Sequence, residues 1–327
     1  MAQRPQLIIV IVFSAVAACS GKGKELLGKA MGKKDPAAAS EVSGQGESMG
    51  RWKKLWDTTI SSPADPEGLS EDACLDIMVT GAGDIFAAGY GTALEAKDSK
   101  RDAVIRRLAG DGHEIVVEWP VVFDARKGDD MTLALALDPR GAIFAVGSAR
   151  QYENADSALD GWIRKFSPTG QEDVFNWDKK IVDDRLTGGF ESVNDIVAHG
   201  SLVFAAGHYN SSGWLRAYTA SGEESLTWRV EETTRPSQAD AVAVDSKGAV
   251  YLAGYSRNGA QPFVWLKKYA SAGKEDAEAW NKKFNVDLVG GTVEPRLALD
   301  SKDNVYLGFT GRNLVSPESG LDWWVKR

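Results

Sequence analysis

The sequence repeats one β-rich unit five times, and this repeat constrains the fold more than any other feature. One complete copy lies between residues 239 and 283. It holds an alternating apolar run, a turn, a second run ending in glycine, a polar gap, a third run, another turn and a short segment closing on Trp280. No helical periodicity interrupts these runs. The unit therefore predicts four antiparallel strands, A to D.

The other copies keep the same order. The predicted strands are A at residues 75–79, 133–137, 193–198, 241–244 and 296–299, B at 85–89, 143–147, 203–207, 250–254 and 305–309, and C at 104–108, 162–166, 214–218, 265–269 and 324–327. Predicted strand D ends in Trp119, Trp177, Trp228 and Trp280, and its fifth copy, ending in Trp56, precedes the first strand A. This permuted order predicts an all-β fold over residues 51–327, a five-bladed β-propeller of four-stranded antiparallel blades. The N-terminal strand closes the ring and removes an exposed edge.

Two residue types are expected to serve packing. The four tryptophans at one position of predicted strand C are interpreted as core residues, since a ligand cage would not need the same ring in every repeat; they are Trp162, Trp214, Trp265 and Trp324. Cys74 lies in a strand-like run and is expected to be a small buried apolar residue.

The first fifty residues have a different character. Residues 1–18 have a basic start, an apolar run and a small-residue end, which predicts a secretion signal. The order Val16-Ala17-Ala18-Cys19 resembles the bacterial lipobox, and the resemblance implies cleavage before Cys19, acylation of Cys19 and a lipid-anchored protein of the cell envelope. Ser20, by the same resemblance, implies the outer membrane. Residues 19–50 lack aromatic residues and sustained apolar periodicity, which predicts a flexible tether.

Charge and cysteine content exclude several function classes. The net charge is −8, with +2 on residues 1–50 and therefore −10 on the rest. Such a body lacks the basic face that binds phosphates, so no nucleic-acid partner is expected. With Cys19 in the signal region, one cysteine remains, which excludes a disulfide framework and a thiolate zinc site. No metal, no cofactor and a monomer are expected.

The repeat resembles a known family of repeats. The alternating strand A, the Asp-x-x-Gly turn, the aromatic strand B ending in glycine and runs such as Trp162-Ile163-Arg164-Lys165-Phe166 are similar to bacterial β-propeller repeats of the SBBP type. The resemblance covers most of residues 51–327 and implies a surface or secreted protein without shared catalytic residues. A second resemblance, to pyrroloquinoline-quinone-like propellers of outer-membrane assembly lipoproteins, is weaker, because the spacing from glycine to tryptophan is longer here.

Strand direction predicts where a ligand face lies. The A–B and C–D turns are tight and fall on one face, where aspartates are interpreted as turn formers. The longer B–C and D–A segments fall on the other face, where binding residues are expected. At its rim the copies carry different residues just past strand B, namely Tyr90, Ser148, His208, Tyr255 and Thr310, and Arg257 and Arg312 follow close behind in two copies. The candidate ligand face consists of Tyr90, His208, Tyr255, Arg257 and Arg312.

The sequence leaves two hypotheses for function. No Ser-His-Asp arrangement or metal-ligand spacing recurs, so the main prediction is a lipoprotein whose propeller binds or scaffolds an envelope protein or polysaccharide without catalysis. The alternative is a glycan-cleaving enzyme with carboxylates from the inner strands, although the candidate acids fall at unequal positions of the aligned repeats. Those acids are Asp76, Asp195, Asp240 and Glu294.

Overall fold

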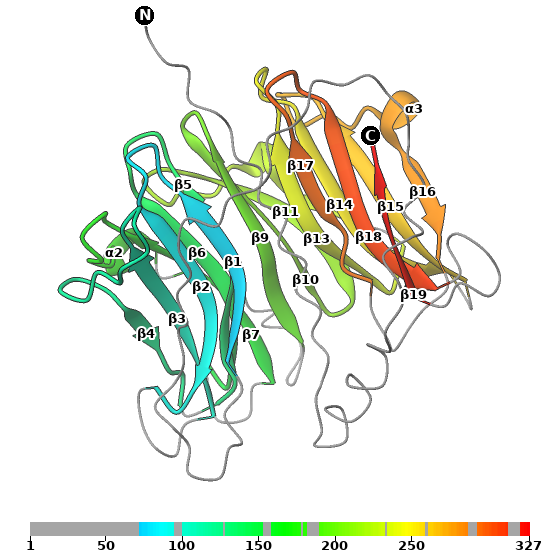
Figure 1. Cartoon of the computed structure of the whole chain (residues 1–327). Coiled ribbons are helices and arrows are strands. Elements are labelled where there is room, and N and C mark those ends of the chain that lie inside the picture. The colour runs from blue at the N-terminus through cyan, green and yellow to red at the C-terminus, as the bar shows by residue number, and fades with distance from the viewer. Residues whose placement is uncertain are drawn as a thin grey trace, which may run out of the picture. The chain divides into compact units, whose positions relative to one another are not determined.

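Five antiparallel sheets follow one another along the described part of the chain (Figure 1). The computed structural model describes residues 72–94, 100–126, 128–152, 158–177, 179–181, 190–232, 234–258, 261–286, 293–312 and 321–327. The first two sheets are β1 (Ala73–Val79), β2 (Ile85–Thr92), β3 (Arg101–Leu108) and β4 (Val121–Phe123), then β5 (Asp130–Leu137), β6 (Ile143–Arg150), β7 (Leu159–Phe166) and β8 (Lys179–Ile181). The third and fourth are β9 (Glu191–His199), β10 (Leu202–Tyr209), β11 (Ser212–Thr219) and β12 (Val230–Glu231), then β13 (Ser237–Val244), β14 (Val250–Asn258), β15 (Gln261–Tyr269) and β16 (Lys282–Asn285). The fifth holds β17 (Arg296–Leu299), β18 (Val305–Arg312) and β19 (Leu321–Lys326).

The first strand of each sheet is its inner strand. β1 contacts β5, β5 contacts β9, β9 contacts β13, and β13 contacts β17. Each sheet runs outward from that strand in chain order. The prediction of an all-β chain is confirmed, that of four-stranded antiparallel sheets is confirmed in the first four sheets, and the arrangement is propeller-like. The predicted closing strand at residues 52–56 lies outside the described residues.

The outer strands differ from the prediction. Each tryptophan expected to end strand D instead precedes the outer strand, which begins two residues later. Trp177, Trp228 and Trp280 end single helical turns: α2 (Val174–Trp177), η1 (Leu226–Trp228) and α3 (Ala277–Trp280). The reason is packing, because each indole lies edge-on against the aromatic side chain of the second strand of its own sheet. The ring centroids lie 4.7 to 5.1 Å apart in the pairs Phe86–Trp119, Phe144–Trp177, Phe204–Trp228 and Tyr251–Trp280.

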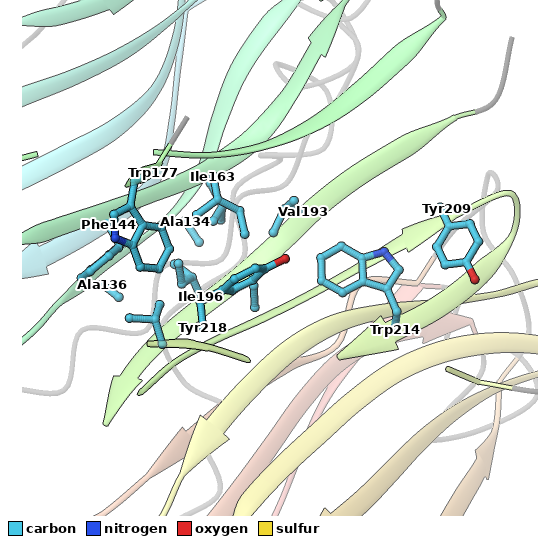
Figure 2. Packing of buried hydrophobic residues seen from close by; sticks show 13 residues of the cluster. Ala134, Ala136, Phe144, Ile163, Trp177, Val193, Ile196, Tyr209, Trp214 and Tyr218 are labelled. Carbon is cyan, nitrogen blue, oxygen red and sulfur yellow. The ribbon is translucent and has the colours of Figure 1, made fainter. Parts of the chain in front are cut away.

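These aromatic pairs belong to apolar layers between neighbouring sheets. Figure 2 shows the layer between the second and third sheets, where Phe144 and Trp177 lie close to Ile196 and Tyr218. The Trp177 ring is fully buried, and its Nε1–H donates to the carbonyl of Ala220 in the next sheet at 3.0 Å. Burying a ring of this size stabilises the contact between sheets by roughly 3 kcal/mol or more.

The prediction that the tryptophans of strand C are core residues is confirmed in three sheets and is wrong in the fifth. Trp162, Trp214 and Trp265 are at most 2% exposed, whereas Trp324 is 37% exposed on β19. Cys74 was expected to be buried, but it is exposed and lines a cavity of about 120 Å³. The turn aspartates are confirmed as turn formers: Asp245, for example, accepts hydrogen bonds from the N–H groups of Lys247 and Ala249.

A β-bulge recurs in the inner strands and explains the glycine of the second strand. One extra residue interrupts the register of the first four inner strands: Leu75 in β1, Leu133 in β5, Asn194 in β9 and Asp240 in β13. At Gly207, opposite the bulge of β9, a Cβ atom would lie 2.1 Å from the carbonyl oxygen of Ser192. Only glycine permits this approach of the two backbones.

Candidate functional site

The bulges bring charged side chains to one place on the inner strands. The residue after each bulge is Asp76 in β1 and Asp195 in β9, and the strand register gives Arg296 the corresponding place in β17. The second and fourth sheets carry alanine there. The expectation that the candidate acids fall at unequal repeat positions is therefore wrong for Asp76 and Asp195, since counting the extra residue makes them equivalent.

Asp76 and Asp195 make the same hydrogen bonds. Asp76 accepts from the N–H of Ile77 at 2.8 Å and from the N–H of Leu135 in the next sheet at 2.7 Å. Asp195 accepts from the N–H of Ile196 at 2.8 Å and from the N–H of Val242 in the next sheet at 2.7 Å. Each carboxyl group thus links two neighbouring inner strands.

Burial governs the charge of both groups. Desolvation raises the pKa of Asp76 to about 6 and that of Asp195 to about 7, and it outweighs the backbone N–H groups and Arg296, which lower both pKa values. The charge of Asp76 further raises the pKa of Asp195. At neutral pH, Asp76 is mostly ionised, whereas Asp195 is about half protonated.

Asp240 is the bulge residue of β13 and the most deeply buried acid of the set. It is 2% exposed, and its Oδ1 accepts hydrogen bonds from Gln238 Nε2 at 2.9 Å and from Asn194 Nδ2 at 3.3 Å. Its Oδ2 is buried and has no hydrogen-bond partner. Burial raises the pKa of Asp240 well above its usual range.

Arg296 interacts electrostatically with all four candidate acids. It lies 3.4 Å from Glu294, and both side chains are exposed. The guanidinium lowers the pKa of Asp76, Asp195 and Asp240, whereas Glu294 raises that of Asp240. The structure therefore brings together all four acids of the alternative hypothesis, from β1, β9, β13 and the segment before β17. We call Asp76, Asp195, Asp240 and Glu294 the acidic cluster.

A pocket lies beside this cluster, at the ends of β10 and β14. It encloses about 250 Å³ and is lined by Phe190, His208, Ser211, Pro236, Ser237, Gln238, Tyr255 and Arg257. Three residues of the candidate ligand face, His208, Tyr255 and Arg257, thus line one pocket. The other two do not: Tyr90 lines the cavity beside Cys74, and Arg312 is exposed at the end of β18.

Side-chain contacts connect the pocket to the acidic cluster. Asn194 Nδ2 lies 3.4 Å from His208 Nδ1 and also contacts Asp240, and Gln238 contacts Asp240 from the pocket wall. Burial lowers the pKa of His208 to about 4, so the imidazole is neutral at neutral pH. Sequence reasoning missed Phe190, Asn194 and Gln238, although the place of Asn194 beside Asp195 in a bulged strand was a usable signal.

Two further findings concern the described residues alone. Within them, no group of three or more His, Cys, Asp and Glu side chains is placed to hold a metal ion. No helix among them has the length and apolar character needed to cross a membrane.

Comparison with known proteins gives a fold likeness only. No family model matches the chain, and no curated protein does. Similar solved structures include an exo-β-1,3-galactanase from Phanerochaete chrysosporium, with 10% identity and a TM-score of 0.46 over 81% of this chain and 64% of the galactanase chain. An endo-arabinase from Bacteroides thetaiotaomicron has 11% identity and a TM-score of 0.37 over 82% of this chain and 97% of its own. The catalytic domain of an α-L-arabinofuranosidase from Coprinopsis cinerea has 12% identity and a TM-score of 0.37 over 81% and 92%.

Two sequence predictions are corrected by these findings. A binding or scaffolding module without catalysis was the main prediction, with the chain expected not to be an enzyme. The findings instead favour the alternative hypothesis of a glycan-cleaving enzyme, because the candidate acids gather in the acidic cluster. The similar structures named above are glycoside hydrolases. The prediction also took the candidate acids to fall at unequal repeat positions, whereas Asp76 and Asp195 occupy equivalent positions.

Proposed function

We propose that the protein hydrolyses glycosidic bonds of a polysaccharide at the acidic cluster. The observation that carries the proposal is the gathering of four carboxyl groups from four parts of the chain around Arg296. Glycoside hydrolysis needs one carboxyl group that donates a proton and a second that is ionised. Neighbouring carboxyl groups held in different protonation states supply that pair.

The roles follow from the protonation states. Asp195 donates its proton to the glycosidic oxygen as the bond from that oxygen to the anomeric carbon breaks. Asp76, mostly ionised at neutral pH, takes a proton from the water that forms the new bond to the anomeric carbon. Both carboxyl groups are oriented by backbone N–H groups, so neither has to be fixed at the moment of reaction. Asp240 positions Gln238 and Asn194 and is not required to touch the scissile bond.

The test is turnover of polysaccharides by the full chain. Release of reducing ends is measured on a panel of neutral and acidic polysaccharides, and Asp195→Asn is expected to lower kcat by about 10²- to 10⁴-fold, the usual contribution of a general acid. The control is Asp245→Asn, which alters a turn aspartate at the opposite end of β13. No release by the unaltered chain, or full activity of Asp195→Asn with an unchanged melting temperature, contradicts the proposal.

For the fold, we propose a five-bladed propeller whose ring is closed by an N-terminal strand. In the first four sheets the outer strand starts two residues after the tryptophan that recurs in each repeat, at residues 121, 179, 230 and 282. Applied to Trp56, the same rule puts the fifth outer strand at residues 58–60. In support, β19 exposes Trp323, Trp324 and Val325, which another strand would cover.

For the location, we propose a lipoprotein with SBBP-type repeats, acylated at Cys19 and tethered by residues 19–50 to the outer membrane of the cell envelope. The support is the order Val16-Ala17-Ala18-Cys19 and the composition of the tether. Cys19→Ala is expected to release the protein from membranes, and mass spectrometry of the N-terminal peptide is expected to show an acylated cysteine. A mature N-terminus at a residue other than Cys19 contradicts the proposed acylation.

A further inference from the structure

The pocket beside the acidic cluster contains one buried polar group without a hydrogen-bond partner, the hydroxyl of Tyr255. Tyr255 is 6% exposed, and its buried hydroxyl has no hydrogen-bond partner. A buried unpaired hydroxyl costs roughly 1 to 3 kcal/mol, so such a group is expected where a ligand completes the hydrogen bonding. At the rim, the ring of Phe190 is 61% exposed.

The charge of the pocket favours an anion. Among the described residues that line the pocket, Arg257 is the cationic side chain and none carries a carboxylate. The acid nearest to the pocket along the hydrogen bonds of Gln238 and Asn194 is Asp240, and burial disfavours its charged form. His208 is neutral for the same reason. An anionic ligand would therefore meet a guanidinium without an opposing charge in the pocket wall.

The size of the pocket limits the ligand. Its volume of about 250 Å³ lies below the roughly 300 to 1,000 Å³ of pockets that enclose drug-sized ligands. One sugar ring is a suitable occupant, and an exposed aromatic ring at the rim offers an apolar surface for one face of that ring.

We propose that this pocket binds an acidic sugar unit, a uronic acid residue of a glycan, with Arg257 binding the carboxylate, Tyr255 donating a hydrogen bond and Phe190 packing against the ring. The inference rests on the proposed function in one respect, since it makes the pocket a subsite of the hydrolytic centre. Arg257 is then a specificity residue that selects acidic over neutral glycans.

The test compares D-glucuronate with D-glucose as probes for the full chain, by ligand-observed NMR titration. Glucuronate is expected to bind at least tenfold more tightly than glucose, and more weakly as salt is added. Arg257→Gln is expected to remove this preference. Arg312→Gln is the matched control, because Arg312 has the same place in β18 as Arg257 has in β14 and does not line the pocket.

Tyr255→Phe separates binding from folding. It is expected to leave the melting temperature unchanged or raise it, because it removes an unpaired buried hydroxyl, while weakening glucuronate binding severalfold.

Equal affinity for both sugars, no binding of either, or the same loss in Arg312→Gln as in Arg257→Gln overturns the inference. Hydrolysis of neutral glycans alone would overturn it and leave the proposed function standing. Glucuronate binding without turnover of any polysaccharide would contradict the proposed function and leave the inferred binding of an acidic sugar standing.

Discussion

Asp195 illustrates, at the scale of the residue, how one side chain serves both stability and chemistry. Its carboxyl oxygens accept N–H groups from its own strand and from β13 and so link two sheets. Burial nevertheless raises its pKa to about 7. Because each oxygen keeps a further lone pair, the group carries a proton without losing these bonds. The same residue can therefore hold β9 against β13 and act as a proton donor.

This raised pKa predicts a pH dependence of stability. Between about pH 4 and pH 7 the folded chain holds a proton on Asp195 that the unfolded chain has lost, so the free energy of unfolding falls as the pH rises through that window. Asp76 acts in the same direction up to about pH 6. His208 opposes them: its pKa is lowered to about 4, so its contribution to stability is lost as the pH falls below its unfolded value of about 6.5.

Urea unfolding of the full chain and of Asp195→Asn at several pH values between about 4 and 8 measures this contribution. The unaltered chain is expected to lose more stability than the variant as the pH rises, because asparagine does not titrate. Asp111→Asn is the control, since Asp111 is exposed and its pKa is lowered. If the difference between the unaltered chain and Asp195→Asn is the same at every pH, the carboxyl group is ionised throughout and the proposed proton donor is wrong.

At the scale of the element, the bulge and its opposing glycine determine where the inner strand bends. The contacts that a Cβ added to this glycine would make are alike in four sheets. At Gly89 the Cβ would lie 1.8 Å from the carbonyl oxygen of Ala73, and at Gly254 it would lie 2.1 Å from the carbonyl oxygen of Gln238. In the fifth sheet the corresponding residue is Phe309, which is 1% exposed and packs edge-on against Trp324 at 5.5 Å. The described pairing of β17 with β18 begins at Arg296, opposite Gly308, so no paired residue of β17 lies opposite Phe309.

Gly207→Ala tests this account. The new methyl group would meet the backbone of Ser192 at 2.1 Å and the ring of Trp214 at 2.6 Å, so the variant is expected to lose more than about 3 kcal/mol of stability or to fail to fold. Gly81→Ala in the β1–β2 turn, where nothing lies within 4 Å, is expected to change the free energy of unfolding by less than about 0.5 kcal/mol. Similar melting temperatures for both variants would show that the inner strand does not need the bulge.

The same elements show what the sequence can and cannot predict. Alternation with a period of two locates the first three strands of each sheet, because side chains on a strand face opposite sides. It misplaces the outer strand, since Trp177 and Trp280 end helical turns of four residues, too short to show a 3.6-residue period. Counting the bulge would have aligned Asp76 with Asp195. The raised pKa of Asp240 depends first on its burial and then on the charges of Glu294 and Asp195, and no local pattern encodes it.

At the scale of the whole molecule, the described fifth sheet lacks the outer strand that the other four have. Those four outer strands begin two residues after Trp119, Trp177, Trp228 and Trp280. In the fifth sheet, Trp323 is 67% exposed and Val325 is 41% exposed on β19, the outermost described strand. An unpaired edge with exposed apolar side chains favours aggregation, and natural sheets avoid it. A segment from the N-terminal side of the chain, with Trp56 two residues ahead of it, would remove both liabilities.

Three shortened chains separate the parts of this proposal. A chain beginning at Gly50 keeps Trp56 and residues 58–60 and is expected to melt like the full chain, because the tether adds no packing. A chain beginning at Asp57 keeps the proposed strand but loses an aromatic ring, which is expected to cost about 3 to 5 kcal/mol. A chain beginning at Ser61 loses both and is expected to melt lowest or to aggregate, since such a loss is a large share of the roughly 5 to 15 kcal/mol of a typical domain. If the chains beginning at Gly50 and Ser61 melt at the same temperature, residues 52–60 contribute nothing to the fifth sheet, and the ring is either open or closed by another segment.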